Sequence, residues 1–581
     1  MKKHLLILAG AAIAASAYAQ SAAPEFMWAN LLDGLTAAGD NAIGNCVGLN
    51  HSVAWLGTYG SNDAQGSEIT YAGAPLFNGA SYSGTSNNGN LTLLKTNYEG
   101  NKEWVVYTDS GDWLSSQGGV ATTSEGSLIF AAKVRHTDGH MDIPIKFHDV
   151  DGETDLEWIQ QADDTRCYRI VVGKVSNEGA LEWLRTIEVG LGKDAENPVS
   201  DGATLGNITI DNNDNIYLAL GHSTDLSVPT EDGASHVVAT NPDAVSVNGV
   251  PTDFLTLSLD ADGYYRNALT LTGTPAEAKC AKVEWLNGNL YIQGTVRVDG
   301  DAALSVGGKA LKASALTSPV VMRTDADFNI SWAKCFTMTE VGGKGTMQNA
   351  GLSEANGVLW FCGMYNGQLN DPDDASKFVA STQEKIREGY IIKLDAATGE
   401  WLAARNSRDD EFCNPSALAK TGLTGYLEVI ASPYNSDKIY VFGYVMNLNV
   451  GVFLREYDAN TLEANVVSGE HNVITGGGVP TAMDCAFDAT SGYVYISARG
   501  NKAFVVDGEE MQTAPNAWGV LLSAFRLPDD MTTGVESVEV SNTDGDEEVE
   551  YFNLQGMRVK NPGEGIYIRR QGNKAVKVIR R

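Results

Sequence analysis

Residues that could bind a metal ion gather in one short stretch of the chain. It holds three of the eight His residues, His136, His140 and His148, and Asp149 and Asp151 follow directly. Imidazole nitrogens and carboxylate oxygens bind transition metals, and alternating carboxylates bind calcium. The stretch has neither H-E-x-x-H nor D-x-[DN]-x-[DN]-G spacing, so a solvated loop is the favoured interpretation. We predict no resident cofactor, and calcium is the ion that the composition leaves open.

Three tryptophans in or beside long connecting segments are the candidates for ligand contact. They are Trp113, Trp158 and Trp518. An indole ring can stack on a sugar ring, or it can pack beneath a loop. Packing is the favoured interpretation, and stacking on a glycan is the alternative.

Motifs of several enzyme classes are missing from the chain. It contains no G-x-S-x-G elbow, no P-loop and no dinucleotide-binding fingerprint. With 73 Asp and Glu residues, a glycosidase carboxylate pair cannot be selected from the sequence. The net charge of −32 opposes binding to the phosphates of nucleic acids.

A repeated strand-like word reveals the elements that must position any site. Near its end the word has an apolar residue followed by glycine, or a close variant of this pair. A tight polar turn precedes the word in most copies. The seven copies are VAWLGTY (53–59), LIFAAKV (128–134), IYLALGH (216–222), LYIQGTV (290–296), LWFCGMY (359–365), IYVFGYV (439–445) and VYISARG (494–500). Another short strand precedes each turn, so each copy belongs to a hairpin.

A second word follows each hairpin after a variable gap. It combines a strand, a turn with Asp, Asn or Gly, and a further strand that carries Trp104, Trp183, Trp332 or Trp401 in four copies. Two hairpins make a unit of four antiparallel strands, and seven such units predict an all-β fold, a seven-bladed β-propeller. A stack of separate β-sandwich domains is the alternative, because the repeat spacing of about 55–90 residues is long for a propeller.

The best-formed copy of the second word is YIIKLDAATGEW, at 390–401. Its K-x-D-x-x-G-x-x-x-W form resembles the repeats of bacterial seven-bladed propeller families, which include quinoprotein-like and related secreted propellers. The resemblance covers about 26–530. It implies the fold and not a chemistry, because propellers host many functions.

The last unit ends at LLSAFRLPDD and lacks a fourth strand. The segment FMWANLL, 26–32, has the tryptophan-bearing form of that strand. We therefore predict that it pairs with the strand at 519–526 and closes the ring, which would remove an exposed sheet edge. The long connections between the second and third strands of the units should gather on one face and carry the binding site.

The N-terminal segment has the parts of a secretory signal peptide, predicted at 1–19. Two lysines precede a short apolar run, and Ala17-Tyr18-Ala19 predicts cleavage between Ala19 and Gln20. No later run of about 18 apolar residues follows, so we predict that the protein is not an integral helical membrane protein.

The seven cysteines are widely spaced and form no metal-binding pair. Cys280, Cys362 and Cys485 lie in the apolar runs AKCAKV, LWFCGMY and MDCAFD, which predicts small buried side chains. One or two disulfides remain an alternative in an exported protein.

The C-terminal part changes from acidic to basic. Residues 531–550 predict a solvated acidic linker, and 551–581 predict a small β-unit with the words YFNLQGMRV and GIYIRRQGNKAVKVIRR. These words resemble the end of the C-terminal sorting domains of type IX secretion, found on exported proteins of Bacteroidota-like bacteria. The resemblance implies contact with export machinery through 551–581 and delivery through the periplasm of a Gram-negative bacterium. A plain structural appendage is the alternative.

These patterns predict four regions: a signal peptide (1–19), a propeller (20–530), the acidic linker (531–550) and the C-terminal unit (551–581). For the function, we favour a secreted or cell-surface binding protein without catalytic activity, whose partner is an extracellular protein or glycan. No nucleic acid is expected as a partner. A secreted polysaccharide hydrolase or lyase on the same scaffold is the alternative.

Overall fold

The computed structural model shows an all-β chain. It describes residues 23–34, 40–59, 67–79, 89–108, 112–137, 145–156, 166–190, 202–240, 253–300, 303–341, 345–381, 387–407, 423–432, 435–446, 451–464, 472–476, 481–514, 518–527, 549–552, 558–559, 565–571 and 574–580. Within these residues the one helical element is the 3-10 turn Leu49–His51. Helices that could span a membrane are absent from this described part. The predicted signal peptide, with Ala19 and Gln20, lies outside it.

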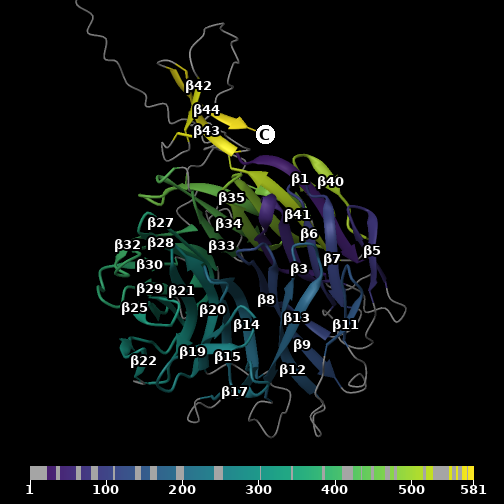
Figure 1. The fold of residues 1–581 in the computed structure, drawn as a ribbon. Helices are drawn as coiled ribbons and strands as arrows, with labels where there is room; N and C mark the ends of the chain where they lie inside the picture. The colour runs from purple at the N-terminus through teal and green to yellow at the C-terminus, as the bar shows by residue number, and fades with distance from the viewer. Residues whose placement is uncertain are drawn as a thin grey trace, which may run out of the picture.

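Seven antiparallel sheets, each with at least four strands, make up the main body of the described chain (Figure 1). Their strands follow here from the innermost outward. The first three sheets begin with β2 (Asn41–Val47), β3 (Val53–Tyr59), β6 (Asn90–Thr96) and β7 (Lys102–Thr108); β8 (Asp112–Thr122), β9 (Leu128–Thr137), β12 (Arg166–Val175) and β13 (Leu181–Val189); and β14 (Ala203–Ile210), β15 (Ile216–His222), β18 (Asp253–Leu259) and β19 (Tyr265–Thr270). The next two are β20 (Glu277–Leu286), β21 (Asn289–Arg297), β24 (Ser318–Thr324) and β25 (Ile330–Cys335); and β27 (Thr346–Ala355), β28 (Val358–Asn366), β31 (Glu388–Asp395) and β32 (Trp401–Asn406). The last two begin with β33 (Leu423–Ala431), β34 (Lys438–Met446), β35 (Gly451–Asp458) and β36 (Asn472–Gly476); and β37 (Thr481–Asp488), β38 (Tyr493–Gly500), β41 (Gly519–Arg526) and β1 (Glu25–Gly34).

The repeated word of the sequence forms the second strand of every one of these sheets. Its copies lie in β3, β9, β15, β21, β28, β34 and β38. Residues Val53–Tyr59 of β3 are buried throughout, as are Ile216–His222 of β15. A strand that is covered on both faces has a continuous apolar run, and that run made the repeat visible.

The innermost strands contact one another in a cyclic order. In the described chain β2 contacts β8, and the order continues through β14, β20, β27 and β33 to β37, which contacts β2 again. The innermost strand of each sheet thus contacts the innermost strands of the sheets before and after it.

The N-terminal strand completes the last sheet, as the sequence predicted. β1 pairs antiparallel with β41, from Glu25 opposite Arg526 to Asp33 opposite Gly519. Figure 1 shows β1, in purple, beside the yellow-green β41. The first of the described strands is therefore held by a strand from the far end of the body.

The long connections are not only loops, which corrects the prediction of four strands per unit. Four of them contain a hairpin that pairs with the outer strand of the preceding sheet and extends that sheet to six strands. These hairpins are β4 (Ser67–Tyr71) with β5 (Ala74–Gly79), β10 (Lys146–His148) with β11 (Glu153–Asp155), β16 (Leu226–Pro229) with β17 (Ser235–Val238), and β39 (Phe504–Val506) with β40 (Glu509–Met511). Each hairpin covers an edge whose N–H and C=O groups would otherwise lack partners.

Two smaller sheets lie in other connections. One pairs β22 (Leu304–Val306) with β23 (Lys309–Leu311). The other joins β26 (Thr337–Thr339), β29 (Gln368–Asn370) and β30 (Phe378–Ala380). Several further connections lie outside the described residues, so the prediction of a binding face made of long loops is not tested.

Tryptophan–turn contacts join neighbouring sheets. The indole N–H of Trp28 on β1 donates to the carbonyl of Tyr98, 2.8 Å away in the turn between β6 and β7. The indoles of Trp104 and Trp332 donate in the same way to Asn177 and Ala396, in the corresponding turns of the following sheets, at 2.9 and 3.0 Å. These three tryptophans thus join one sheet to the next.

Glycine in the turn allows this close approach. Gly100 and Gly179 have φ of 81° and 99°, which favours glycine. A Cβ at Gly100 would lie 2.6 Å from the ring of Trp28, and one at Gly179 would lie 2.7 Å from that of Trp104. The glycines of the repeated turns therefore serve both the turn and the packing of the next tryptophan.

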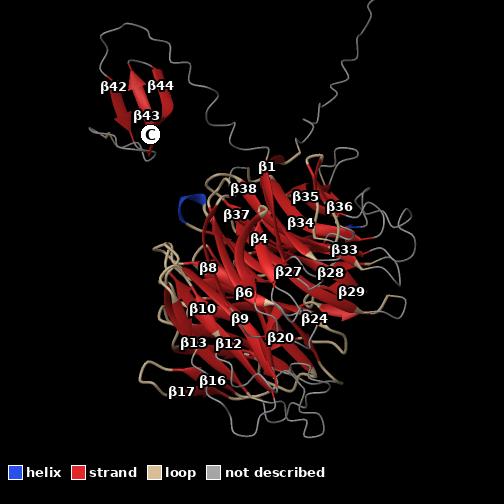
Figure 2. Ribbon diagram, turned by 90° about the vertical axis from the view of Figure 1, so that its right-hand side faces the viewer, coloured by secondary structure: helices blue, strands red, loops and turns tan. Residues whose placement is uncertain are grey.

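The C-terminal unit is a separate three-stranded sheet. β42 (Val549–Phe552), β43 (Gly565–Gln571) and β44 (Lys574–Arg580) pair only with one another among the described strands. Figures 1 and 2 both show this sheet apart from the main body. β42 begins two residues before the predicted unit at 551–581, within the predicted linker.

Five cysteines are described with their side chains, and all are free thiols: Cys46, Cys280, Cys335, Cys362 and Cys485. Cys280, Cys362 and Cys485 are buried, as predicted. Burial raises the pKa of Cys280 and Cys335 to about 12, so both stay protonated at neutral pH.

Candidate functional site

The seven innermost strands enclose a cavity of 480 Å³, which we call the central cavity. Each of β2, β8, β14, β20, β27, β33 and β37 contributes residues to its wall. A volume of this size lies within the usual range for small-molecule sites. The cyclic order of the strands therefore creates one shared space at their inner edges.

A β-bulge recurs in every one of these strands over the described residues. A bulge leaves extra residues unpaired, so it changes which side chains of the strand face a given direction. The first paired residue after the bulge is Gly44, Gly118, Ile208, Lys282, Leu352, Glu428 and Asp484, in chain order. All seven line the central cavity. The repeated bulge thus brings one residue of each strand to the cavity wall.

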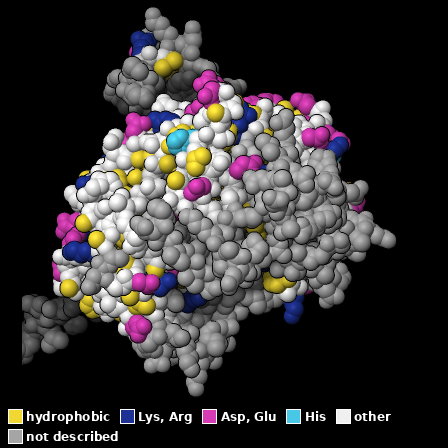
Figure 3. Space-filling model, turned by 90° about the horizontal axis from the view of Figure 1, so that it is seen from below, with side chains coloured by type: hydrophobic (Ala, Val, Ile, Leu, Met, Phe, Trp, Pro, Cys, Tyr) yellow, Lys and Arg dark blue, Asp and Glu magenta, His cyan; other side chains and the backbone are white. Residues whose placement is uncertain are grey.

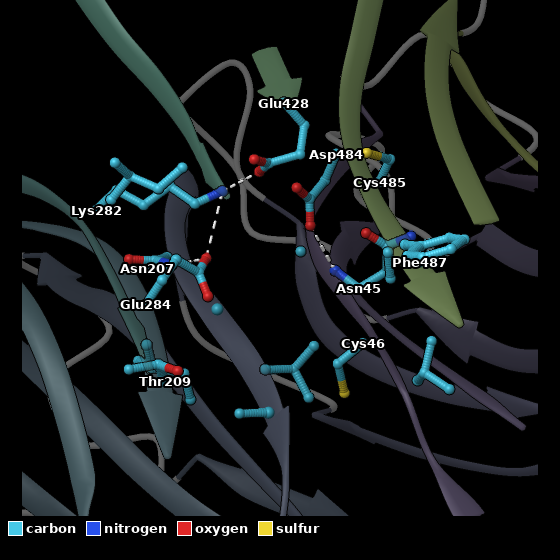
Figure 4. A pocket seen from close by; sticks show the side chains of 18 of the residues that line it. Asn45, Cys46, Asn207, Thr209, Lys282, Glu284, Glu428, Asp484, Cys485 and Phe487 are labelled. Atoms are coloured by element: carbon cyan, nitrogen blue, oxygen red, sulfur yellow. Dashed lines mark hydrogen bonds and ion pairs between the residues drawn. The ribbon is translucent and has the colours of Figure 1, made fainter. Parts of the chain in front are cut away.

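Lys282 links two of the sheets across the cavity. Its ammonium group on β20 forms an ion pair with the carboxylate of Glu428 on β33. A second carboxylate, of Glu284, lies 3.4 Å away. Glu284 is two residues further along β20, and alternation puts its side chain on the same face as Lys282. Figure 4 shows Lys282 between the two carboxylates.

Asn207 holds this part of the wall in place from the neighbouring strand β14. Its side-chain oxygen accepts the N–H of Val283 at 2.8 Å, and its amide donates to the Val283 carbonyl at 3.0 Å. The same amide lies 3.3 Å from the carboxylate of Glu284. The contacts fix β20 against β14 and orient Glu284.

Asp484 and Asn45 form the opposite side, as Figure 4 shows. The carboxylate of Asp484 accepts the backbone N–H of Asn45 at 2.8 Å. The side-chain amide of Asn45 donates to the carbonyl of Tyr495 at 3.0 Å, which fixes its orientation. Its side-chain oxygen, Oδ1, is buried and has no hydrogen-bond partner in the described structure.

Burial and mutual repulsion raise the pKa values of two of the carboxyl groups. Burial raises the pKa of Glu284 to about 7, with repulsion from Glu428 and Asp484 adding to it and Lys282 opposing it. Burial also raises the pKa of Asp484 to about 6, although Lys282 and the N–H of Asn45 act against it. Burial lowers the pKa of Lys282, but the three carboxylates outweigh it and raise the pKa well above its usual value.

The cavity is therefore a polar site with one permanent cation and two acids that titrate near neutral pH. Perturbed carboxyl groups inside a cavity are typical of functional sites. Carboxylate and amide oxygens accept hydrogen bonds, so the arrangement suits a ligand rich in donors. Glu284 and Asp484 could also exchange protons with a bound molecule.

Two of the tryptophans singled out from the sequence, Trp113 and Trp518, do not line the central cavity. Trp113 is fully buried and packs edge-on against Phe147, so it lies in the core, in line with the favoured packing interpretation. Trp518 is half-buried beneath the guanidinium of Arg499, which lies 4.2 Å from its ring. Trp158 lies outside the described residues, so its role stays a prediction.

The predicted metal-binding stretch is described only in part. The ring of His148 stacks on Tyr107, with centroids 4.7 Å apart. Asp149 accepts the backbone N–H groups of Asp151 and Gly152 in its own turn. In the described chain these residues belong to no group of metal ligands.

His140 and the side chain of His136 lie outside the described part of the stretch. A metal site that needs them is therefore not tested, and calcium stays an open prediction as well.

The residues of the cavity were missed because the words that hold them were interpreted by their cysteines. AKCAKVEWL contains Lys282 and Glu284, and MDCAFD contains Asp484. The useful indication was a charged residue in the middle of a first strand. Glu428 in TGYLEVIA has the same form.

Comparison with known proteins identifies no family. No family model and no curated protein sequence matches the chain. A quinohemoprotein alcohol dehydrogenase from Comamonas testosteroni is similar in structure, with 11% identity, a TM-score of 0.38, and coverage of 89% of this chain and 79% of that one. An ulvan lyase of polysaccharide lyase family PL25 has 7% identity, a TM-score of 0.34, and coverage of 86% and 96%. A protein of unknown function from Dyadobacter fermentans has 11% identity, a TM-score of 0.34, and coverage of 72% and 96%. Likeness at this level says nothing about the activity or ligand of this chain.

Proposed function

We propose that the protein is an exported seven-bladed β-propeller that binds a ligand in the central cavity and does not transform it. The cyclic contacts of the seven innermost strands support the propeller. The pairing of β1 with β41 supports closure of the ring by the N-terminal strand. The partner is an extracellular protein or glycan, reached from the cell surface or the medium.

One observation carries the choice of site: polar side chains follow the bulges on β20, β33 and β37 and line a single cavity. A structural role alone would be met by apolar residues, as at Leu352 and Ile208. Charged groups in such a place cost desolvation energy, which a ligand can offset.

A binding screen tests the site. Wild-type protein is compared with Asp484→Asn, Glu284→Gln and the control Glu125→Gln, which changes an exposed acid in a turn. Oligosaccharides, peptides and small ions are scored by the rise in melting temperature, since a ligand at 100 times its Kd adds about 2.7 kcal/mol. We expect a ligand that stabilises the wild type and the control but not the cavity variants. A ligand that binds both cavity variants unchanged would place the site elsewhere.

A second candidate is a polysaccharide hydrolase or lyase. The raised pKa values of Glu284 and Asp484, about 7 and 6, lie in the range that suits a general acid and base. On this alternative, Glu284→Gln lowers kcat on a responsive polysaccharide about 100-fold or more, because general acid–base groups contribute that much. Binding without any turnover over a broad polysaccharide panel would favour the first candidate.

Export is the remaining part of the proposal, and it rests on the signal peptide at 1–19 and the unit at 551–581. In the native host, deletion of 551–581 should retain the protein in the periplasm. Cell fractionation with detection of the main body measures this, and Glu125→Gln in the full chain is the control. Normal amounts of the truncated protein at the surface or in the medium would reduce 551–581 to a structural appendage.

A further inference from the structure

The charges that line the central cavity do not balance. The charged residues of its wall are Lys282, Glu284, Glu428 and Asp484, within the described structure. Three carboxyl groups therefore face one ammonium group. Elsewhere, for example on the described part of the face in Figure 3, acidic and basic side chains are scattered and form no single acidic patch. Among the described residues of its wall, the central cavity thus carries an excess of acidic groups.

Lys282 forms ion pairs with the carboxylates on one side of the cavity and none with Asp484 on the other side. It pairs with Glu428 and lies 3.4 Å from Glu284. Asp484 has no ion pair within the described residues; its carboxylate accepts the backbone N–H groups of Asn45 and Cys485, and Lys282 attracts it without pairing with it. Lys282 also shows that an alkylammonium group is accommodated between these strands.

Asn45 supplies an independent indication. It is 8% exposed and lines the same cavity, and its Oδ1 has no hydrogen-bond partner in the described structure. A buried acceptor without a donor costs about 1–3 kcal/mol, so a donor from a ligand is favoured there. The Oδ1 of Asn45 and the carboxylate of Asp484 together favour a ligand with a positively charged N–H donor.

We propose that the central cavity binds a cationic nitrogen group, an alkylammonium or guanidinium, with the carboxylate of Asp484 and the Oδ1 of Asn45 as its acceptors. The inference rests on the proposed function and names the ligand class of that site. Two sources carry this chemistry, a free amine and a Lys or Arg side chain of a peptide. A divalent metal is not favoured, because the described residues contain no group of three metal ligands.

Calorimetry on the folded full chain tests the inference at pH 7.5 and low salt. The small cations are the diamine 1,6-diaminohexane and the guanidinium compound Nα-acetylarginine amide, and their neutral counterparts are 1,6-hexanediol and Nα-acetylcitrulline amide. Blocked Gly-Lys-Gly and Gly-Arg-Gly peptides represent the second source. We expect at least tenfold lower Kd for the cations than for their neutral counterparts, and the better of the two sources identifies the natural one.

Asp484→Asn is the decisive variant, because Asn keeps an oxygen that can accept the N–H of Asn45. It should weaken cation binding at least tenfold, while Glu125→Gln leaves it unchanged. Equal binding by Asp484→Asn would overturn the inference. If a neutral sugar binds in the cavity and the cations do not, the inference fails and the proposed function stands; if no probe class binds, both fail.

A pH series on the wild type needs no variant to fold. Asp484 and Glu284 become protonated between pH 7.5 and pH 5, because burial raises their pKa values to about 6 and 7. Cation binding should therefore weaken at least tenfold over this range. The other titratable side chains of the cavity are Glu428, Lys282, Cys46 and Cys485. Burial raises the pKa of both thiols, so they stay neutral. Affinity that does not change with pH would contradict the role of the carboxylates.

Discussion

The tryptophan–turn contacts and the wall of the central cavity use the same repeat in different ways. Trp28, Trp104 and Trp332 each donate an indole N–H to a turn carbonyl of the following sheet. The residues after the bulges, in contrast, range from glycine to Leu352 and Asp484. At these three boundaries between sheets, the same contact solves a separate packing problem. The central cavity is a single space, so the seven residues that follow the bulges can be of different types.

The two regions also differ in what they contribute to stability. An indole ring against a glycine turn buries apolar surface and satisfies its own N–H group. The cavity buries carboxyl groups whose ionisation is unfavourable there, as the raised pKa values of Glu284 and Asp484 indicate. Substitutions should therefore destabilise the protein at the contacts and can stabilise it in the cavity.

The largest effect should follow deletion of 20–33, which removes β1. β41 would lose its partner on one side, and the contact of Trp28 with the turn at Tyr98 would be lost. Several apolar side chains of β1 pack in the core, each worth about 1.5–3 kcal/mol when buried, so we expect a loss above about 5 kcal/mol.

Thermal unfolding of the whole body measures this effect. Deletion of 551–581 is the control, and it should leave the melting temperature unchanged. If the protein without 20–33 kept its melting temperature, β1 would not close the ring.

Replacement of one tryptophan should have the next largest effect. Trp332 is buried, and Trp332→Ala should cost about 3–5 kcal/mol. Trp332→Phe keeps most of the apolar surface and loses the hydrogen bond to Ala396, so about 1 kcal/mol is expected. Chemical denaturation gives both values, with exposed Leu402→Ala as a control expected within about 0.5 kcal/mol. If Trp332→Ala and Leu402→Ala lowered the free energy of unfolding equally, the contact between Trp332 and the turn at Ala396 would not contribute to stability.

Removal of the cavity's cation should have a smaller effect that depends on pH. Lys282→Met leaves Glu428 and Glu284 without their partner, and we expect a loss of about 2 kcal/mol at pH 8. The loss should shrink at pH 5, where protonation removes the repulsion. Denaturation at both pH values measures it, and exposed Lys309→Met is the control. The same loss at both pH values would show that packing, not charge, explains it.

The smallest effect should be a gain of stability in Glu284→Gln. Burial raises the pKa of Glu284 from 4.5 to about 7, so the folded state holds the proton more tightly than the unfolded state. The stability that this proton contributes is present below about pH 4.5 and is lost as the pH rises through about 7.

Gln cannot ionise, so the variant should equal the wild type near pH 4 and exceed it at pH 8. The gain should be smaller than the value of about 3 kcal/mol that the full pKa shift corresponds to, because 27% of the Glu284 side chain is exposed to solvent and Lys282 loses an ionised partner. Denaturation curves at the two pH values test the sign, with Glu125→Gln as the control. A variant less stable than the wild type at pH 8 would mean that the ionised Glu284 is favourable to the fold.

The sheets could be predicted from the sequence because their second strands are buried on both faces. VAWLGTY and IYLALGH stand out as apolar runs and coincide with β3 and β15. The pairing of 26–32 with 519–526 followed from a missing fourth strand and a matching tryptophan. Each apolar run is a weak indication of a strand by itself, and its repetition seven times made the prediction of repeated sheets possible.

The cavity could not be predicted in the same way. A bulge changes which side chains face inward, and the alternation of apolar residues does not show where it occurs. The residues that meet there, such as Lys282, Glu428 and Asp484, are far apart in sequence and share no motif. The hairpins that extend the sheets were missed too, because strands such as β10 and β11 have only three residues each.

The place of β1 has a consequence for the order of events during synthesis. β1 precedes every other described strand, and its partner β41 follows all the others of the seven sheets. The first strand to leave the ribosome must therefore wait for almost the whole chain before it can pair. Contacts so distant in sequence form late and slowly. A chain cut short at any earlier point would have an open edge on its last sheet, which leaves it exposed to proteases. Pairing of β1 with β41 therefore requires a chain that has been synthesised at least as far as Arg526.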